Sequence, residues 1–478
     1  MTLKTPLTAA LAVALVACSA PQPSTTASAA GVAPTVKLPP LNPADLDSVI
    51  QRVMKEKQLV GLSIGVMQDG KPVYVKAFGF RSLALNAPVT TTTMFPVGSV
   101  TKQFTCSSAL LLQQDGKLSM RDPVAKYAPN ATAANRITLL DLGQHVSGYR
   151  DYYPLDFVDR EMQVAVPADT IIARYATRPL DFEPGTRWSY SNTNFTILGK
   201  AVEMASGKPL GAFMKERIFT LLGMTRTAFD PPATDTGLST GYTSYALAAP
   251  SPARPEASGW TGAAGAIFST PTDLLTWDLA LLDGKALSPA SYATLTTPRT
   301  LTDGRSTAYG CGMSVRLTGD AVVLRHGGAV AGSVAQNIII PGTRSAIAIL
   351  SNADFAATGD IIAAAMQRLT PQVDVPKVAG LPALEAAKAF LASVEKGAVD
   401  RATLGDDFNA LLTPEHLATD RKSLAAHGPI TDVRIGAVRE RGGMEVAQVL
   451  YMVGKTPATS AMYRTPDGKI QQFLINRR

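Results

Sequence analysis

Apolar residues recur along the first part of the chain with two different periods, and each period predicts a different kind of element. Over residues 46–57 the apolar spacing is that of a helix face, and Asn42-Pro43 is a start signal for it. Residues 62–67 and 73–80 are β-rich apolar runs joined by a turn with Asp-Gly, which predicts a β-hairpin. A strongly apolar helix is predicted over residues 101–114.

The middle of the chain, residues 139–223, has the pattern of helices and loops with few strands. Strands return late, at residues 321–325, 333–340 and 346–350, and a closing helix is predicted over 361–369. An early hairpin and late strands therefore flank a mostly helical middle. This order predicts one mixed α/β domain whose sheet is built from both ends of the segment, with a helical insert beside it.

The last hundred residues predict a separate, smaller α+β domain. A Pro- and Val-rich linker, 371–382, precedes a clear helix over 383–394. The remaining elements are two shorter helices near 401–412 and 416–426, and strands at 431–439, 444–453 and 459–476, the last bent at Pro466-Asp467-Gly468. Helices followed by an antiparallel meander resemble the cone-shaped NTF2-like domains. Since residues 383–478 hold no catalytic cluster, we expect an accessory domain that binds, dimerises or shapes the cleft.

Composition and charge narrow the class of protein. The chain has 478 residues, enough for two or three domains, with 46% hydrophobic and 17% charged residues, as in globular proteins. The net charge of +7 is scattered, with no basic run of five, and no phosphate-binding loop occurs, so we expect no nucleic-acid partner and no cofactor. The cysteines and histidines do not cluster, which argues against a metal site. Cys106 and Cys311 lie among apolar residues, and we expect buried thiols rather than a disulfide.

The first residues have the pattern of an export signal. Lys4 precedes a short apolar run that ends Leu15-Val16-Ala17-Cys18. Small residues before a cysteine resemble the bacterial lipobox, so residues 1–18 predict a lipoprotein signal peptide with lipidation of Cys18; ordinary secretion with cleavage after Ala20 or Ala30 is the alternative. Residues 19–40, rich in Pro, Ser, Thr and Ala, predict a flexible tether. Ser19, by resemblance, indicates the periplasmic face of the outer membrane.

Three short motifs carry the candidate chemistry. Ser99 lies at the start of a predicted helix and Lys102 is three residues on, on the same helix face, so the amine can reach the hydroxyl. A serine needs such a base to become a nucleophile, and burial lowers the pKa of a lysine. Tyr190 and Asn192 point the same way on an extended backbone, and His326 precedes a Gly-Gly pair within the late strands. Read singly, each motif also fits a structural role: a helix cap, an aromatic loop, a buried histidine.

Together, in this order and spacing, the motifs resemble the serine β-lactamase and DD-peptidase superfamily, nearest its class C side with related esterases and D-amino-acid peptidases. The resemblance covers residues 41–370 and includes His145-Val146-Ser147-Gly148 and Leu350-Ser351-Asn352. It implies a β-lactamase/transpeptidase-like fold, an antiparallel sheet flanked by helices. It also implies that Ser99 is acylated, that Lys102 and Tyr190 share the proton work, that Asn192, His326 and Gly328 bind substrate, and that the N–H groups of Ser99 and Ala329 hold the oxyanion.

The third motif departs from the class C pattern, because His-Gly-Gly stands where those enzymes have Lys-Thr-Gly. A histidine near neutral pH carries less positive charge than a lysine, which favours a peptidase or esterase over an efficient β-lactamase. We therefore expect a serine hydrolase of a D-amino-acid peptide, β-lactam or small ester; the alternative is a penicillin-binding sensor that acylates without efficient turnover. Residues 149–153, rich in tyrosine, are a candidate cavity wall.

A second serine motif, Gly61-Leu62-Ser63-Ile64-Gly65, matches the nucleophile elbow of α/β-hydrolases. That elbow requires a strand, a sharp turn and then a helix. Here the run is itself strand-like and a hairpin follows it, so Ser63 is not expected to be the nucleophile.

Overall fold

The computed structural model describes residues 38, 40–155, 157–318, 321–370 and 376–477. The predicted signal peptide, Cys18 and nearly all of the predicted tether lie outside the described residues, as does part of the linker 371–382. Among the helices that the structure describes, none is long and apolar enough to cross a membrane.

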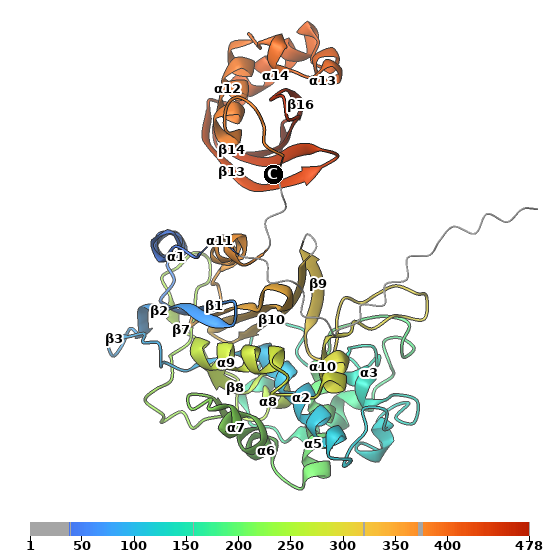
Figure 1. The fold of residues 1–478 in the computed structure, drawn as a ribbon. Helices are drawn as coiled ribbons and strands as arrows, with labels where there is room; N and C mark the ends of the chain where they lie inside the picture. Colours follow the sequence, from blue (N-terminus) through green and yellow to red (C-terminus); the bar gives the residue numbers. More distant parts are fainter. Residues whose placement is uncertain (1–37, 39, 156, 319–320, 371–375, 478) are drawn as a thin grey trace, which may run out of the picture. The chain divides into compact units, whose positions relative to one another are not determined.

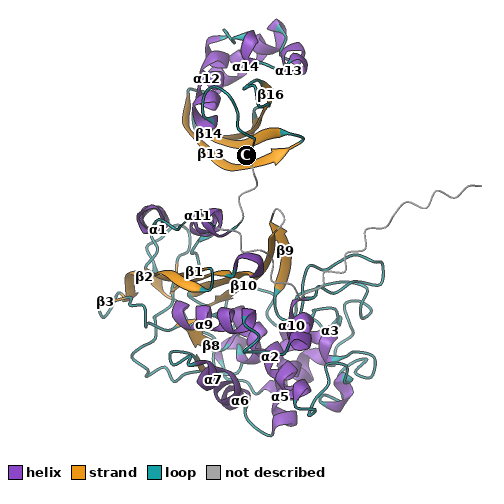
Figure 2. Cartoon of the chain, in the orientation of Figure 1, coloured by secondary structure: helices purple, strands orange, loops and turns teal. Residues whose placement is uncertain are grey.

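A seven-stranded antiparallel sheet forms the centre of the first domain (Figures 1 and 2). In spatial order its strands are β3 (Ala87–Pro88), β2 (Lys71–Ser82), β1 (Gly61–Gln68), β12 (Ser345–Ser351), β11 (Ser333–Ile340), β10 (Ala321–Val330) and β9 (Ser314–Thr318). β1 pairs with β12, with Leu62 opposite Ser351, so the two ends of the segment do meet in one sheet, as predicted. The sequence pattern missed β9, whose side chains are mostly exposed and therefore lack an apolar signal.

Helices cover both faces of this sheet, which explains why its central strands read as continuous apolar runs. On one face lie α1 (Pro43–Lys57) and α11 (Gly359–Leu369), packed on Ile347 and Ile349 of β12. The alternate residues of β12, Ala348 and Leu350, face the larger core on the other side. There α9 (Pro271–Leu282) packs so closely on β1 that a Cβ added at Gly65 would lie 2.9 Å from Leu275. Figure 1 shows α1 and α11 on one side of the sheet and α9 on the other.

The helical part of the domain surrounds α2 (Thr101–Gln114), which is buried along nearly its whole length. The other helices are α3 (Leu139–Gly143), α4 (Ala168–Ile171), α5 (Asn192–Ser206), α6 (Leu210–Met214), α7 (Thr220–Leu222), α8 (Gly262–Gly265) and α10 (Pro289–Thr296). Two minor sheets join them: β4 (Phe95–Pro96), β8 (Ile267–Ser269) and β5 (Ala228–Phe229), and the pair β6 (Tyr242–Thr243) and β7 (Ser251–Pro252).

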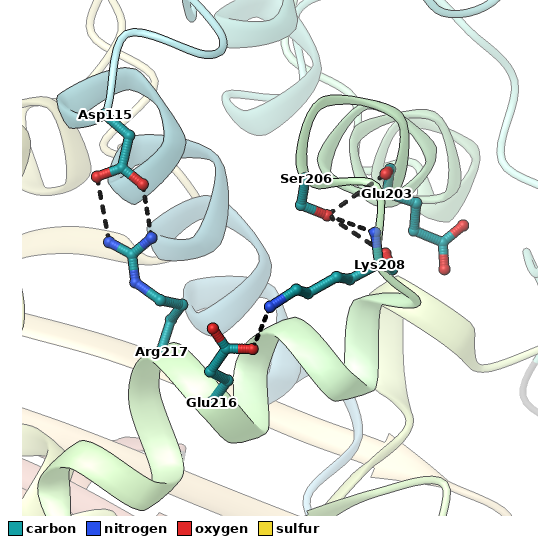
Figure 3. Close-up of polar contacts among 6 residues, drawn as sticks. All are labelled: Asp115, Glu203, Ser206, Lys208, Glu216 and Arg217. Carbon is teal, nitrogen blue, oxygen red and sulfur yellow. Dashed lines mark hydrogen bonds and ion pairs between the residues drawn. The ribbon is translucent and has the colours of Figure 1, made fainter.

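Polar contacts hold the far end of α2 in place (Figure 3). Asp115, the C-cap of α2, accepts two hydrogen bonds from Arg217 at 2.5 and 3.2 Å, and these bonds lower the pKa of the Asp115 carboxyl. Arg217 lies in the π-helical turn Lys215–Phe219 that follows α6, and Lys208 just before α6 pairs with Glu216 of the same turn. Lys102 therefore lies in the first turn of a helix whose opposite end is held by an ion pair.

The C-terminal residues form an α+β unit with a hydrophobic core of its own. Three helices, α12 (Ala383–Lys396), α13 (Asp406–Leu411) and α14 (Pro414–His427), come first. An antiparallel sheet follows, in the order β13 (Ile430–Arg441), β14 (Met444–Val453), β15 (Thr456–Arg464) and β16 (Ile470–Phe473), with β17 (Asn476–Arg477) also paired to β15. The run predicted as one bent strand over 459–476 is three strands, because the turn around Gly468 ends β15. The NTF2-like resemblance stays a prediction.

One expectation about the cysteines is wrong. Cys106 on α2 and Cys311, in the segment before β9, form a disulfide across 205 residues of sequence. Both residues are fully buried, as the apolar surroundings predicted. The pairing depends on the tertiary approach of the two segments, with Cα atoms 5.9 Å apart, which no local pattern reveals.

Candidate active site

Ser99 lies in a short 3-10 turn, Gly98–Val100, between β4 and α2. Neither the turn nor α2 has a side-chain cap, so Ser99 does not serve as the helix cap that its position allowed. Its hydroxyl instead lies 3.0 Å from Nζ of Lys102. Gly98 has a positive φ of 50° and packs against the backbone of Ala329, so any larger residue there would displace β10 from the turn.

Lys102 is fully buried and makes three contacts through Nζ. The amine lies 3.0 Å from Oγ of Ser99, 2.8 Å from Oδ1 of Asn192 and 2.8 Å from the carbonyl oxygen of Ala264. Burial lowers the pKa of Lys102 to about 7, against an opposing pull from the negative charge of Asp151. Near neutral pH a large fraction of the amine is therefore uncharged.

The uncharged amine fits this environment in one way. Two of its contacts, the Asn192 and Ala264 oxygens, can only accept hydrogen bonds, so they take both N–H groups. The lone pair is then left for the one contact that can donate, the hydroxyl of Ser99. This geometry directs the base at the nucleophile's proton.

The second motif is held beside Lys102 by His145, which has a left-handed φ of 58° at the end of the loop after α3. The carbonyl of His145 accepts from the N–H of Ser189, and its Nδ1 accepts from the N–H of Ser191. Its ring stacks on Tyr190 with centroids 4.3 Å apart. Burial holds the pKa of His145 well below its usual value, so the ring is a neutral support.

Tyr190 and Asn192 both reach the site. The ring of Tyr190 lies 4.9 Å from Nζ of Lys102, and a hydrogen bond with Ser99 opposes the effect of burial, which raises the pKa of the phenol well above its ordinary value. Tyr190 is therefore a neutral hydroxyl near Ser99, able to pass a proton but not to act as a standing phenolate base. Asn192 is the first residue of α5, and its amide accepts from Lys102 and donates to Asp151.

His326 lies on β10 and borders the cavity, but both ring nitrogens are engaged by the protein. Nδ1 donates to the carbonyl of Gly327 at 2.6 Å, so Nε2 accepts from the hydroxyl of Tyr309 at 2.8 Å. Burial, with the nearby Lys102 charge, lowers the pKa of His326 to about 3. This wall of the site is therefore uncharged where a lysine would bring a positive charge.

Gly328 and Ala329 bring the backbone of β10 against the serine turn. A Cβ added at Gly328 would lie 1.9 Å from the carbonyl oxygen of Val97 and 3.1 Å from the amide nitrogen of Ser99. Only glycine allows this approach. The backbone of Ala329 next to it packs on Gly98. The backbone groups expected to hold the oxyanion are thus on adjoining segments.

Ser99 opens into a cavity of about 1070 Å³. Tyr190, Asn192, His326, Gly328 and Ala329 line it, so all the predicted substrate-binding residues border one space with the nucleophile. Its wider walls combine aromatic and apolar side chains with the charged side chains of Arg254 and Asp354; the aromatic and apolar ones include Tyr152, Tyr153, Leu155, Phe157, Tyr245 and Trp260. Of the candidate wall 149–153, Tyr152 and Tyr153 face the cavity, whereas Tyr149 is buried with its hydroxyl on the carbonyl of Thr132.

The sequence analysis assigned no functional role to three residues that contact the site: Asp151, His145 and Tyr309. Asp151 and His145 lay inside segments singled out for other reasons, the candidate wall and a family landmark. Tyr309 lies in an irregular segment without a motif, and only its contact with His326 reveals it. Ser63, the rejected nucleophile, is fully buried within β1, outside the cavity lining.

Solved structures resemble this fold. A penicillin-binding protein homologue from Pyrococcus abyssi, described as octameric, aligns with a TM-score of 0.61 and 20% identity, over 92% of this chain and 96% of its own. D-amino acid amidase from Ochrobactrum anthropi SV3 aligns with a TM-score of 0.58 and 21% identity, over 68% and 98%. At these identities the comparison establishes the β-lactamase/transpeptidase-like fold.

Sequence relatives agree with the fold. D-aminopeptidase from Brucella anthropi is 31% identical over 293 residues, which are 60% of this chain and 55% of the relative. A D-aminopeptidase from Brucella ovis is 27% identical over 343 residues, 71% of this chain and 64% of the relative. The aligned part thus spans between about half and two thirds of the length of these relatives. The model of the beta-lactamase family matches residues 46–370, about two thirds of the chain. The chain therefore belongs to the beta-lactamase family.

Proposed function

We propose that the protein is a serine hydrolase that cleaves the amide or ester bond of a small D-amino-acid derivative through an acyl-enzyme on Ser99. The observation that carries the proposal is the buried amine of Lys102, whose two obligate acceptors leave its lone pair for the Ser99 hydroxyl at 3.0 Å. A base placed this way turns an ordinary serine into a nucleophile.

The reaction follows from these positions. The Ser99 proton passes to Lys102 as Oγ bonds to the substrate carbonyl carbon, and the resulting oxyanion lies at the backbone N–H groups of Ser99 and Ala329. The carbon–nitrogen or carbon–oxygen bond then breaks, and the leaving amine or alcohol takes a proton from Lys102 through the Tyr190 hydroxyl. Water attacks the acyl-enzyme by the same proton route in reverse. The products are a carboxylic acid and the leaving group, and Ser99 and Lys102 return to their starting states.

The walls of the cavity support a substrate with a bulky apolar side chain. The neutral ring of His326 offers no cation to a substrate carboxylate, although Arg254 also lines the cavity. Tyr152, Phe157 and Trp260 offer apolar surface for a bulky side chain. The related D-aminopeptidases support a D-amino acid on the acyl side. An amide of an apolar D-amino acid fits both the apolar lining and these relatives.

Three probes test the proposal on protein lacking residues 1–18: D-phenylalanine p-nitroanilide beside its L-isomer, p-nitrophenyl butyrate, and a fluorescent penicillin. We expect turnover of the D-anilide and the ester, and loss of at least about a thousandfold in Ser99→Ala, because the nucleophile is gone. Ser63→Ala, a buried serine of β1, is the matched control and should retain activity.

Intact mass spectrometry follows each probe. A penicillin adduct that depends on Ser99 and persists, without turnover of the other probes, would favour the penicillin-binding sensor. Rapid penicillin turnover would make the protein a β-lactamase despite His326. Equal activity of Ser99→Ala would overturn the assignment of the nucleophile.

We also propose that the protein is exported and anchored at the periplasmic face of the outer membrane through lipidated Cys18. The sequence Leu15-Val16-Ala17-Cys18 is the basis of this proposal. The buried Cys106–Cys311 disulfide supports export, because such bonds form and persist in oxidising compartments such as the periplasm.

A further inference from the structure

Asp151 lies beside Asn192, which donates most of the hydrogen bonds that its carboxylate accepts. Oδ1 accepts from the backbone N–H of Asn192 at 2.9 Å and from its side-chain Nδ2 at 3.1 Å, and Oδ2 lies 3.3 Å from the same Nδ2. Oδ1 also accepts from the N–H of Tyr153 at 3.2 Å, which shapes the local turn. Asp151 is not among the residues that line the cavity.

These contacts decide which way the Asn192 amide faces. An asparagine amide has two orientations of nearly equal shape that exchange its oxygen and its NH2 group. A carboxylate can only accept, so Asp151 requires the NH2 group on its own side. The carbonyl oxygen of the amide is then turned to Lys102, at 2.8 Å from Nζ.

The orientation of that amide matters to Lys102. When the oxygen of Asn192 faces Lys102, the uncharged amine donates one N–H to that oxygen and the other to the carbonyl of Ala264. Its lone pair then faces Ser99. With the amide reversed, the NH2 group would donate to the same lone pair and compete with the Ser99 hydroxyl. We propose that Asp151 is a positioning residue that holds the Asn192 amide with its oxygen toward Lys102 and thereby keeps the lysine lone pair on Ser99. This inference rests on the proposed acyl-enzyme function.

The charge of Asp151 adds a signature that a purely structural residue would lack. Several titratable groups surround Lys102: Tyr190 before α5, His145 after α3, His326 on β10 and Asp151 in the loop. Of these, Asp151 supplies the negative charge that raises the pKa of Lys102 against the lowering by burial. Removing that charge lowers the lysine pKa further, so the acid limb of the rate profile moves to lower pH.

The test compares Asp151→Asn with Asp151→Glu, and with Asp181→Asn as the matched control. Asp181 is the partner of Arg150, the residue next to Asp151, but belongs to an exposed ion pair. We expect Asp151→Asn to slow acylation of Ser99 by about 10- to 100-fold with KM changed by less than about threefold, because orientation rather than binding is lost. The acid limb of the pH–rate profile of Asp151→Asn should move to lower pH. Asp151→Glu, which keeps the charge, should leave the limb in place, and Asp181→Asn should match the parent protein.

A second readout does not depend on activity. The 13Cε resonance of Lys102, assigned by its absence in Lys102→Met, reports the lysine titration directly in 13C-lysine protein. A titration at lower pH in Asp151→Asn supports the proposal. Two results would overturn it. One is an unchanged lysine titration together with an equal fall in the acylation rate of Asp151→Asn and Asp151→Glu. The other is a variant whose KM rises while its acylation rate stays that of the parent. If the parent protein forms no acyl-enzyme at all, the proposed function fails instead, while the resonance still shows whether Asp151 and Lys102 are coupled.

Discussion

At the scale of single residues, the site depends on placing an amine where water cannot reach it. Lys102 is fully buried, and burial penalises its charged form more than the negative charge of Asp151 stabilises it. His145 and His326 next to it are kept neutral by the same burial. Tyr190 is kept protonated, since burial raises its pKa. Burial therefore sets the protonation states of these side chains, and Lys102 is the one among them whose pKa lies near neutral pH.

A pH profile tests this assignment. The pKa of Lys102 is lowered from 10.5 to about 7, so the active, uncharged form is lost as the pH falls through that value. We expect kcat/KM for the D-anilide to fall about tenfold for each pH unit below about 6 and to reach a plateau above about 8. Lys102→Met should lower kcat/KM by at least about a hundredfold on the plateau above about pH 8 and should lack the acid limb, while its melting temperature stays equal or rises, because a costly buried amine is removed. A profile with no limb between pH 5 and 9 would contradict a lysine base.

At the scale of elements, a disulfide ties the nucleophile helix to a segment of the opposite wall. Cys106 is four residues after Lys102 on α2, and Cys311 is two residues after Tyr309, which hydrogen-bonds His326. Gly312 packs its Cα against the backbone of Lys102, where an added Cβ would lie 2.6 Å from the carbonyl oxygen. The bond thus joins the helix that carries Lys102 to the segment whose Tyr309 contacts His326 of the third motif.

Replacing both cysteines, Cys106→Ala with Cys311→Ala, should lower the free energy of unfolding by about 2–5 kcal/mol, since the bond closes a long loop in the unfolded chain. Denaturant titration of both proteins with and without reductant measures this. The parent protein should lose stability in reductant, and the double variant should not respond. Equal stability of the two proteins without reductant would show that the bond contributes nothing.

At the scale of the whole molecule, the described residues form separate hydrophobic cores. Two cores lie on the two faces of the seven-stranded sheet, a small one with Tyr152 and Trp260 supports the cavity wall, and a fourth belongs to residues 383–475. Ser99, Lys102, Asn192 and His326 lie, with the partners that position them, within residues 46–370, the range that the family model matches. The chemistry is therefore a property of the first domain.

The proposed anchor also belongs to the whole molecule. In a bacterial host with an outer membrane, the full chain should fractionate with that membrane, and its N-terminal peptide should carry lipid on Cys18. Cys18→Ser should move the protein out of the membrane fraction, because the lipid is the only attachment proposed. Ser19→Ala is the control and should stay membrane-bound. A soluble parent protein cleaved after Ala20 or Ala30 would instead establish ordinary secretion.

The residues of each motif could be found from the sequence because their relation is local. Ser99 and Lys102 are one helical turn apart, and Tyr190 lies two residues before Asn192, the first residue of α5, so spacing alone places the members of each pair together. The same holds for the hairpin of β1 and β2 and for α2, whose apolar periods carry the signal. The likeness to a known family then put the three motifs in one site.

Only the tertiary structure decided which distant groups tune those motifs. Asp151 reaches Asn192 across 41 residues, Tyr309 reaches His326 from a segment without a pattern, and Cys106 meets Cys311 across 205 residues. Such contacts depend on how whole elements pack. The periodic pattern of apolar residues carries no information about which distant residue a polar or sulfur side chain will contact. The sequence by itself thus indicated the candidate nucleophile and its candidate base, whereas packing determined the burial that lowers the pKa of Lys102 and the groups that its amine contacts.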